Sequence, residues 1–378
     1  MRLKNILFSN IYRDYTAVGL DVSDFSIKLA KLKKKGAGGV LESHNRISMP
    51  GGVIEEGKIK KEKELSELIK KTISEAKGKK IKTPFAVCSL PEQHAFIKLI
   101  QIPMMTMKEA EKAIKWEMES NIPFSLNEVY LDYHIFPPKD GSNHIDVLIS
   151  AIPKNLVDQY LKVLNSAGVE PIAFEIESTA IIRSLIKRCF SPEPALIIDL
   201  GFARTSFIIF VGKSIRFTSS IPVSNFQMIN DIAKETGLSF NDAQQLKIKA
   251  GLDASKEKGK IFNALVLSVN KIINKIDDCR NFYKEHRHKE SKYPADITKI
   301  ILCGGGANLN GLTQYLSSRL KIPVSLGNPW VNIISQIDNS KKINKTYLKK
   351  ILAIPYQDSL AYATALGLAI RGSELNKN

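Results

Sequence analysis

The sequence predicts an α/β protein made of two related lobes, with a small α+β subdomain inserted into the first. The first observation is a pair of similar segments, AVGLDVSDFSIKLAKL from Ala17 and ALIIDLGFARTSFIIF from Ala195, each of which runs strand, aspartate, small turn and strand. The second is a β-α-β-β-α pattern between them, at residues 92–167. The repeated segment indicates an internal duplication, although strand–turn–strand patterns arise by chance as well.

The composition is that of an ordinary globular protein. The chain has 378 residues, of which 44% are hydrophobic and 25% are charged, and these values exclude a disordered chain, a collagen and a coiled-coil rod. No apolar run reaches the roughly 18 residues of a membrane-spanning helix. The four cysteines are far apart and the N-terminus has no secretion-signal pattern. We therefore expect free thiols in a reducing cytoplasm.

The charge is strongly basic, with 55 lysines and arginines against 38 acids and a net charge of +17. Such a field favours anionic partners, namely a nucleotide, a nucleic acid or an anionic membrane leaflet. The alternative is a lysine-rich but otherwise ordinary surface. Trp116 and Trp330 have no second aromatic residue beside them in a basic segment. We therefore expect no specific nucleic-acid partner.

The first lobe is expected at residues 16–91, after an N-terminal arm at 1–15 that either packs on the body or lies on a membrane surface. AVGLDV, FSIKLAKL, VLESHNRISM and PFAVCSL have strand patterns, and residues 62–78 carry apolar side chains at helical spacing. The lobe is expected to continue at 168–193 and 346–372, where DSLAYATALGLAIRG predicts a closely packed helix.

The inserted subdomain is expected at residues 92–167. It begins with the strand HAFIKLIQIP, after which Thr106 and Glu109 form a capping box for a helix that ends before Pro123. LDYHIF and HIDVLISAI follow as strands. The last helix, PKNLVDQYLKVLNSAG, ends at Gly168.

The second lobe is expected at residues 194–345, with a helical subdomain at 241–298. After the hairpin from Ala195, helices are predicted at 225–236, 240–249 and 257–288. KIILCGGGANLNGLTQYLSSRL then reads as strand, glycine turn and helix, and PVSLG as a short strand.

Two aspartates stand at the same place in the two similar segments. Asp21 and Asp199 end matched strands, so both are expected to point into one cleft between the lobes. Carboxylates there suit Mg²⁺, which keeps several waters and bridges phosphate oxygens. The turn Gly304–Gly306 suits the approach of a ligand to backbone N–H groups, although such a turn can be purely structural. It is not a Walker loop, because Leu312 stands where the lysine is required.

Two hairpins, two aspartates and a glycine turn in this order resemble the actin-like ATPase superfamily. Within it, EAEKAIKWEMESNIPFSLNEVYLDYHIF at 109–136 resembles the type IV pilus assembly protein PilM family. VGLDVSDFSIKLAKL, FEIESTAIIRSL, IIDLGFARTSFIIF, DAQQLK, LCGGGANLNGL and LGNPW resemble the same family, and together these segments cover most of the chain from about 16 to 370.

The resemblance implies a two-lobed actin-like ATPase fold with an inserted small α+β subdomain, as in FtsA. It implies an adaptor that binds ATP with Mg²⁺ in the cytoplasm, at the inner face of the inner membrane. The implied partners are the cytoplasmic N-terminal tail of a PilN-like membrane protein and other inner-membrane proteins of pilus assembly, so that membrane association is indirect.

The resemblance also implies a nucleotide site, in which Asp21 and Asp199 hold Mg²⁺ through water. Glu177 matches the position that orients the attacking water, with a partly buried carboxylate at a helix start as the alternative. The residues implied for binding are Asp21, Ser23, Ser26 and Lys28 in the first hairpin, Asp199, Gly201 and Thr205 in the second, and Lys247, Gly304, Gly305, Gly306, Ala307 and Leu309 around the base and ribose.

Several residues depart from the family pattern. Ser23 replaces the usual glycine in the first turn, Phe25 adds bulk there, and Gln244 and Gln245 stand where glutamate is common. These changes predict at most a slow ATPase. The alternative function is a small-molecule kinase of the same superfamily, which requires an aspartate base in the cleft, and the sequence has no sugar-site pattern.

Overall fold

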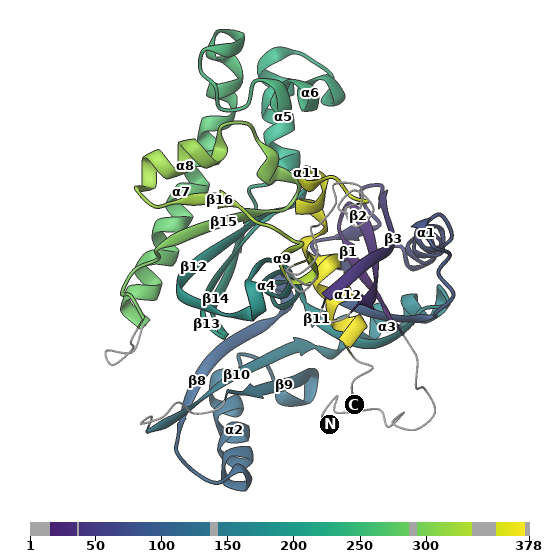
Figure 1. The fold of residues 1–378 in the computed structure, drawn as a ribbon, viewed down its shortest axis with the longest axis vertical. Coiled ribbons are helices and arrows are strands. Elements are labelled where there is room, and N and C mark those ends of the chain that lie inside the picture. Colours follow the sequence, from purple (N-terminus) through teal and green to yellow (C-terminus); the bar gives the residue numbers. More distant parts are fainter. Residues whose placement is uncertain (1–15, 36–37, 137–142, 287–292, 335–352, 375–378) are drawn as a thin grey trace.

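The computed structural model describes residues 16–35, 38–136, 143–286, 293–334 and 353–374 (Figure 1). The predicted arm at 1–15 and the first residues of the predicted segment 346–372 lie outside this range. Within the range, none of the helices is long and apolar enough to cross a membrane.

The first large sheet has the strand order β11-β7-β1-β2-β3-β6. Val18, Leu20 and Val22 alternate with Gly19 and Asp21 along β1, so the two sets face opposite sides of the sheet. The valine–leucine side packs against α1 and α3, and the Gly19 side packs against α12. The elements are β1 Val18–Ser23, β2 Ser26–Lys35, β3 Gly38–Ser48, β4 Ile54–Glu55, β5 Lys58–Ile59, α1 Glu62–Ser74, β6 Lys77–Gly78, β7 Phe85–Leu90, η1 Glu92–His94, α3 Lys154–Ser166, β11 Glu170–Ile176, α4 Glu177–Leu185 and α12 Ala363–Glu374.

The second large sheet has the strand order β14-β13-β12-β15-β16. Its largest apolar core lies beneath α5, α7 and α8. The elements are β12 Ser191–Leu200, β13 Thr205–Gly212, β14 Ser214–Ile221, α5 Asn225–Thr236, α6 Phe240–Lys249, α7 Lys260–His286, β15 Lys299–Cys303, η5 Gly305–Asn308, α8 Leu312–Leu320, β16 Val324–Leu326 and α11 Tyr356–Ser359. The short helix α9 Val331–Ile334, which follows β16, packs against β3 of the first sheet.

The two sheets share one topology. In the first, β1 is antiparallel to β2 and parallel to β7, and β7 is parallel to β11. In the second, β12 is antiparallel to β13 and parallel to β15, and β15 is parallel to β16. A third antiparallel strand follows each hairpin, β3 in one sheet and β14 in the other. This correspondence is what an internal duplication predicts.

A separate three-stranded sheet, β8-β10-β9, carries α2 on one face and forms the lower part of the molecule in Figure 1. Its elements are β8 Phe96–Pro103, α2 Met107–Asn121, β9 Val129–Ile135 and β10 His144–Pro153. The capping box of Thr106 and Glu109 is confirmed. Arg216 on β14 forms an ion pair of 3.7 Å with Asp146 on β10, and this pair joins the small sheet to the second large sheet.

Some elements differ from the sequence predictions. The helix α3 falls inside the predicted subdomain 92–167, but its apolar side chains belong to the core of the first large sheet. The small sheet has its own core, which ends at Ala151. The helix predicted at 62–78 ends at Ser74, because residues 77–78 pair with β3 instead. The division of the chain into domains stays a prediction.

The helix α12 crosses the first sheet at very close range. Gly367 lies against α4, and a Cβ atom at this position would collide with the backbone carbonyl of Ala180. Both helices are buried here, so neither can shift without disturbing the sheet beneath. The small residues of the closing helix therefore set the spacing between α4, α12 and β1.

We predict that Gly367→Ala lowers the free energy of unfolding by about 1–3 kcal/mol, because the added methyl group overpacks this contact. Thermal or urea unfolding measures the loss. The matched control is Gly39→Ala, where the new Cβ would meet its nearest neighbour at an ordinary 3.7 Å. Equal stabilities of the two variants would show that the α4–α12 contact has room to relax.

Candidate functional site

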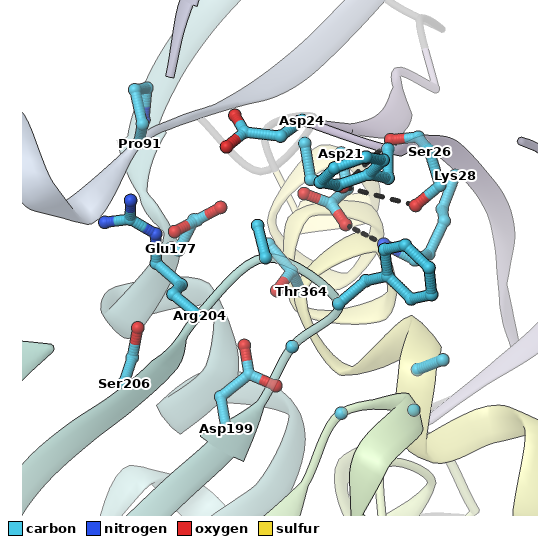
Figure 2. A pocket seen from close by; sticks show the side chains of 18 of the residues that line it. Asp21, Asp24, Ser26, Lys28, Pro91, Glu177, Asp199, Arg204, Ser206 and Thr364 are labelled. Atoms are coloured by element: carbon cyan, nitrogen blue, oxygen red, sulfur yellow. Dashed lines mark hydrogen bonds and ion pairs between the residues drawn. The ribbon is translucent and has the colours of Figure 1, made fainter. Parts of the chain in front are cut away.

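A pocket lies between the two large sheets, where the turns of the β1–β2 and β12–β13 hairpins face each other. Figure 2 shows Asp21 and Lys28 on one side of it and Asp199 and Ser206 on the other. The predicted residues that line it are Asp21, Ser23, Ser26, Lys28, Glu177, Asp199, Gly201, Gly304, Gly305 and Gly306. Residues more than 280 positions apart in sequence thus meet in one cleft.

Asp21 is held by two donors on its own sheet. Lys28 lies directly opposite it in the β1–β2 register, and its Nζ contacts Asp21 Oδ2 at 2.9 Å. The hydroxyl of Ser89, on β7, donates to Asp21 Oδ1 at 3.0 Å. Since Asp21 is 4% exposed, these two contacts offset the desolvation of its charge. At the turn itself, Ser23 donates to the backbone oxygen of Ser26 at 3.0 Å.

Asp199 occupies the matching place on the second sheet. It lies beside Cys303 on β15, whose thiol hydrogen-bonds its carboxylate. Burial, with a contribution from the nearby charge of Asp21, raises the pKa of Asp199 to about 6. The glycine turn packs directly on it, because a Cβ atom at Gly304 would collide with Asp199 Oδ1 and lie 2.5 Å from the carbonyl oxygen of Leu200. Gly304 has φ +82°, a conformation that favours glycine.

Glu177 begins α4 and points into the pocket (Figure 2). Its Oε2 accepts a hydrogen bond of 3.3 Å from the backbone N–H of Glu92, whose own carboxylate accepts one of 3.1 Å from the backbone N–H of Ser178. Burial raises the pKa of Glu177 to about 8, and the charges of Asp21, Asp199 and Glu92 add to this effect. The neutral form of this carboxyl is therefore favoured near neutral pH.

Four of the predicted binding residues lie outside the pocket. Thr205 is buried and donates to the carbonyl of Val223 at 2.7 Å, because side chains alternate along β13 and the next residue, Ser206, faces the cleft beside Asp199. Lys247 is buried behind Asn225, to which it donates a hydrogen bond, and burial lowers its pKa to about 8. The other two, Ala307 and Leu309, belong to the core of the second sheet.

The pocket contains functional groups that the sequence analysis missed. The strand register opposite Asp199 was the available signal for Ser206. The turns themselves contribute Asp24 and Arg204, and α12 contributes Thr364. Nothing in the local sequence pattern around Thr364 marks it, because the packing of α12 across the first sheet places it there.

Four phenylalanines connect the two hairpin turns. The ring of Phe25, in the first turn, lies 4.9 Å from that of Phe202 in the second and 5.7 Å from that of Phe226 on α5. Phe240 on α6 lies 5.5 Å from Phe226. Edge and stacked contacts at these distances are favourable. The bulky Phe25 ring in the first turn therefore forms a direct contact between the lobes.

The pocket is lined by both acidic and basic side chains, so it can take a cation together with an anion. The acidic residues are Asp21, Asp24, Glu177 and Asp199, and the basic residues are Lys28, Arg46 and Arg204. Among the side chains that the structure describes, no group of three or more His, Cys, Asp or Glu converges to hold a metal ion. The carboxylate oxygens suit Mg²⁺, and their sparse arrangement fits an ion that keeps its waters and binds phosphate oxygens.

Comparisons with known proteins agree with this arrangement. Residues 19–373 match the model of a family described as type IV pilus assembly protein PilM. A solved PilM–PilN type IV pilus biogenesis complex has a chain with 24% identity and a TM-score of 0.74, covering 95% of this chain and 99% of that one. MreB5 of Spiroplasma citri bound to ADP has 16% identity and a TM-score of 0.51, over 88% of this chain and 97% of that one.

The cell division protein FtsA is a more distant relative. The FtsA of Enterococcus hirae is 23% identical over 237 residues, which are 57% of this chain and 53% of that protein. The FtsA of Enterococcus faecalis is 23% identical over 230 residues, 55% of this chain and 52% of that one. The chain thus spans about half the length of these relatives. Together with the solved structures, they confirm the actin-like fold that the sequence predicted.

We predict that Glu177→Gln stabilises the nucleotide-free protein increasingly as the pH rises from 5 to 8. A carboxyl whose pKa is raised on folding contributes stability below its unfolded pKa, and this contribution is lost as the pH rises toward the folded value of about 8. Glutamine remains neutral and keeps the hydrogen bond from Glu92. The expected gain in melting temperature at pH 8 is about 2 °C or more.

The matched control is Glu119→Gln on α2, which makes the same substitution at an exposed position. Its effect on the melting temperature is expected to be small. If both variants behaved alike from pH 5 to 8, Glu177 would be an ordinary solvated carboxylate.

Proposed function

The chain belongs to the type IV pilus assembly protein PilM family, and from this premise we propose that it is an ATP-binding adaptor of pilus or related secretion machinery. It acts in the cytoplasm at the inner face of the inner membrane. There it binds the cytoplasmic N-terminal tail of a PilN-like protein, and its membrane association is indirect. The other inner-membrane proteins of pilus assembly are its further partners.

The observation that carries the nucleotide proposal is the convergence of the two matched hairpins. They place Asp21 and Asp199 in one pocket with the glycine turn at Gly304. The likeness in fold to MreB5, which has been solved with ADP and with AMPPNP, supports the same reading. We propose that ATP binds with Mg²⁺, and that Asp21 and Asp199 hold the cation through water.

Each group of the pocket then has a task. The backbone of the glycine turn approaches the nucleoside, and the serine hydroxyls of the first turn face the phosphates. Lys28 neutralises Asp21, which leaves Asp199 as the carboxylate without a lysine partner. The bound Mg²⁺ neutralises phosphate charge. Glu177 is the proposed water-orienting residue, and the slow turnover that we propose rests on Ser23 in the first turn and on Gln244 and Gln245, which depart from the family pattern.

The proposed nucleotide pocket and the proposed partner surface are joined by a short stretch of chain. The backbone N–H that donates to Glu177 belongs to Glu92, the first residue of η1, and β8 of the small sheet begins only four residues later, at Phe96. A nucleotide that draws the lobes together thus acts directly on the base of the small sheet. Nucleotide can shift the protein toward the closed arrangement of the lobes only as far as it binds that arrangement more tightly than the open one. This difference in affinity therefore limits its effect on partner binding.

We place the partner surface on the face of the small sheet opposite α2, beside the point where Arg216 on β14 pairs with Asp146. Ile100 and Ile102 on β8 point into the core with α2, whereas Ile97 and Leu99 alternate with them and are half-buried. Leu148 on β10 pairs directly with Leu99. A peptide that orders on binding needs apolar anchors of this kind. The neighbouring strand β7, by contrast, is wholly buried between β11 and β1 and offers no open face for a peptide.

We predict that a synthetic PilN-like tail peptide binds the full chain more tightly with ATP and Mg²⁺ than without, and that Leu99→Asp weakens binding at least tenfold. The aspartate places a charge where the peptide would bury an apolar side chain. Calorimetry with a scrambled peptide as a reference measures both effects.

The matched control is Trp116→Ala, which removes a large apolar side chain, 75% exposed, from α2 of the same unit. It is expected to leave peptide affinity unchanged. If Leu99→Asp bound the tail as tightly as the unaltered chain, the peptide site would lie elsewhere. If ATP had no effect on peptide affinity, the chain would not be a nucleotide-dependent adaptor, and phosphoryl transfer to a small molecule would become the better hypothesis.

A further inference from the structure

The loop between β12 and β13 contributes a cation to the pocket that the proposed function has not used. Arg204 is the last residue of this loop and is half-buried. It lines both the pocket and the adjoining groove between the lobes. Figure 2 shows its side chain extending away from Asp199, toward Glu177 and Pro91.

Arg204 differs from Lys28, the lysine that lines the pocket, in its surroundings. Lys28 is already paired with Asp21 at 2.9 Å. With the residues that the structure describes, the Arg204 guanidinium forms no hydrogen bond or ion pair. Burial raises the pKa of the Asp24 carboxyl across the cleft, and the positive charge of Arg204 partly offsets that rise. A half-buried guanidinium without a partner has its donors available for an anion.

The position of the guanidinium indicates which part of the anion it would meet. Glu177, the proposed water-orienting residue, belongs at the end of the nucleotide where a water would attack the terminal phosphate. Arg204 extends toward the same end (Figure 2). The planar fork of an arginine matches two phosphate oxygens and is always charged, so it suits a terminal phosphate that has three free oxygens.

We propose that Arg204 is a specificity-determining residue that binds the terminal phosphate and makes the pocket distinguish ATP from ADP. This inference rests on the nucleotide-binding function proposed above and adds to it a residue on the second lobe that contacts only the triphosphate. ADP leaves the guanidinium without its ligand. The lobes are therefore drawn together more strongly by ATP, because Arg204 belongs to one lobe and the first-hairpin residues to the other.

The test is the affinity of the full chain for Mg·AMPPNP and Mg·ADP, measured by calorimetry for the unaltered protein and for variants. Arg204→Ala is expected to raise the Kd for Mg·AMPPNP at least tenfold and the Kd for Mg·ADP less than threefold. Arg204→Lys keeps the charge but not the fork, so an intermediate loss for Mg·AMPPNP is expected. Retained ADP binding shows that each variant is folded.

Arg46 provides the matched control. It lies on β3 opposite Lys28, lines the same pocket, and likewise forms no side-chain hydrogen bond or ion pair within the described part of the chain. Arg46→Ala removes the same charge from the first lobe and is expected to change both affinities by the same factor, leaving their ratio intact.

The remaining outcomes separate the two proposals. If the unaltered chain binds both nucleotides and Arg204→Ala weakens them equally or not at all, the inference is wrong while the nucleotide site stands. If Arg46→Ala alters the ratio of affinities as much as Arg204→Ala does, the discrimination comes from total charge and not from Arg204. If the unaltered chain binds neither nucleotide, the proposed function is wrong and this inference fails with it.

Discussion

The gathering of carboxylates between the two hairpins is the constraint on which the rest of this structure depends. Asp21, Asp24, Glu177 and Asp199 line one pocket, and like charges in a partly desolvated site cannot all remain ionised without compensation. The protein supplies part of this compensation through Lys28, which pairs with Asp21, and through burial, which raises the pKa of Glu177 to about 8 and so favours its neutral form. In the nucleotide complex that we propose, a divalent cation and Arg204 would supply the rest.

The same constraint explains how the lobes communicate. The rings of Phe25 and Phe202 bring the two turns into direct contact, with their centroids 4.9 Å apart, at the edge of the pocket. Glu92 joins the pocket to the small sheet through its backbone, and the pair of Arg216 and Asp146 joins that sheet to the second lobe. The small sheet is therefore held by both lobes, which makes it the natural place for a partner that reports on nucleotide state.

The repeated hairpins, the capping box and most helices were predictable because each has a local signature: an aspartate at a strand end, a Thr–x–x–Glu spacing, a helical period. What local patterns miss is set by tertiary packing. The helix α3 looks like part of the inserted unit, yet its apolar face fits the first sheet. The family resemblance implies Thr205, but the pairing of β12 with β13 places Ser206 opposite Asp199. The shape of the β12–β13 loop places Arg204 in the pocket, and the packing of α12 across the first sheet places Thr364 there.

The most direct test of this arrangement is the affinity of the unaltered chain for ATP with Mg²⁺ and with EDTA, compared with that of Asp199→Asn. If the carboxylates require a cation before a triphosphate can enter, ATP binds well only with Mg²⁺, and Asp199→Asn loses most of this dependence because the uncompensated charge is gone. Equal binding with Mg²⁺ and with EDTA in the unaltered chain would contradict the central role given to the carboxylates.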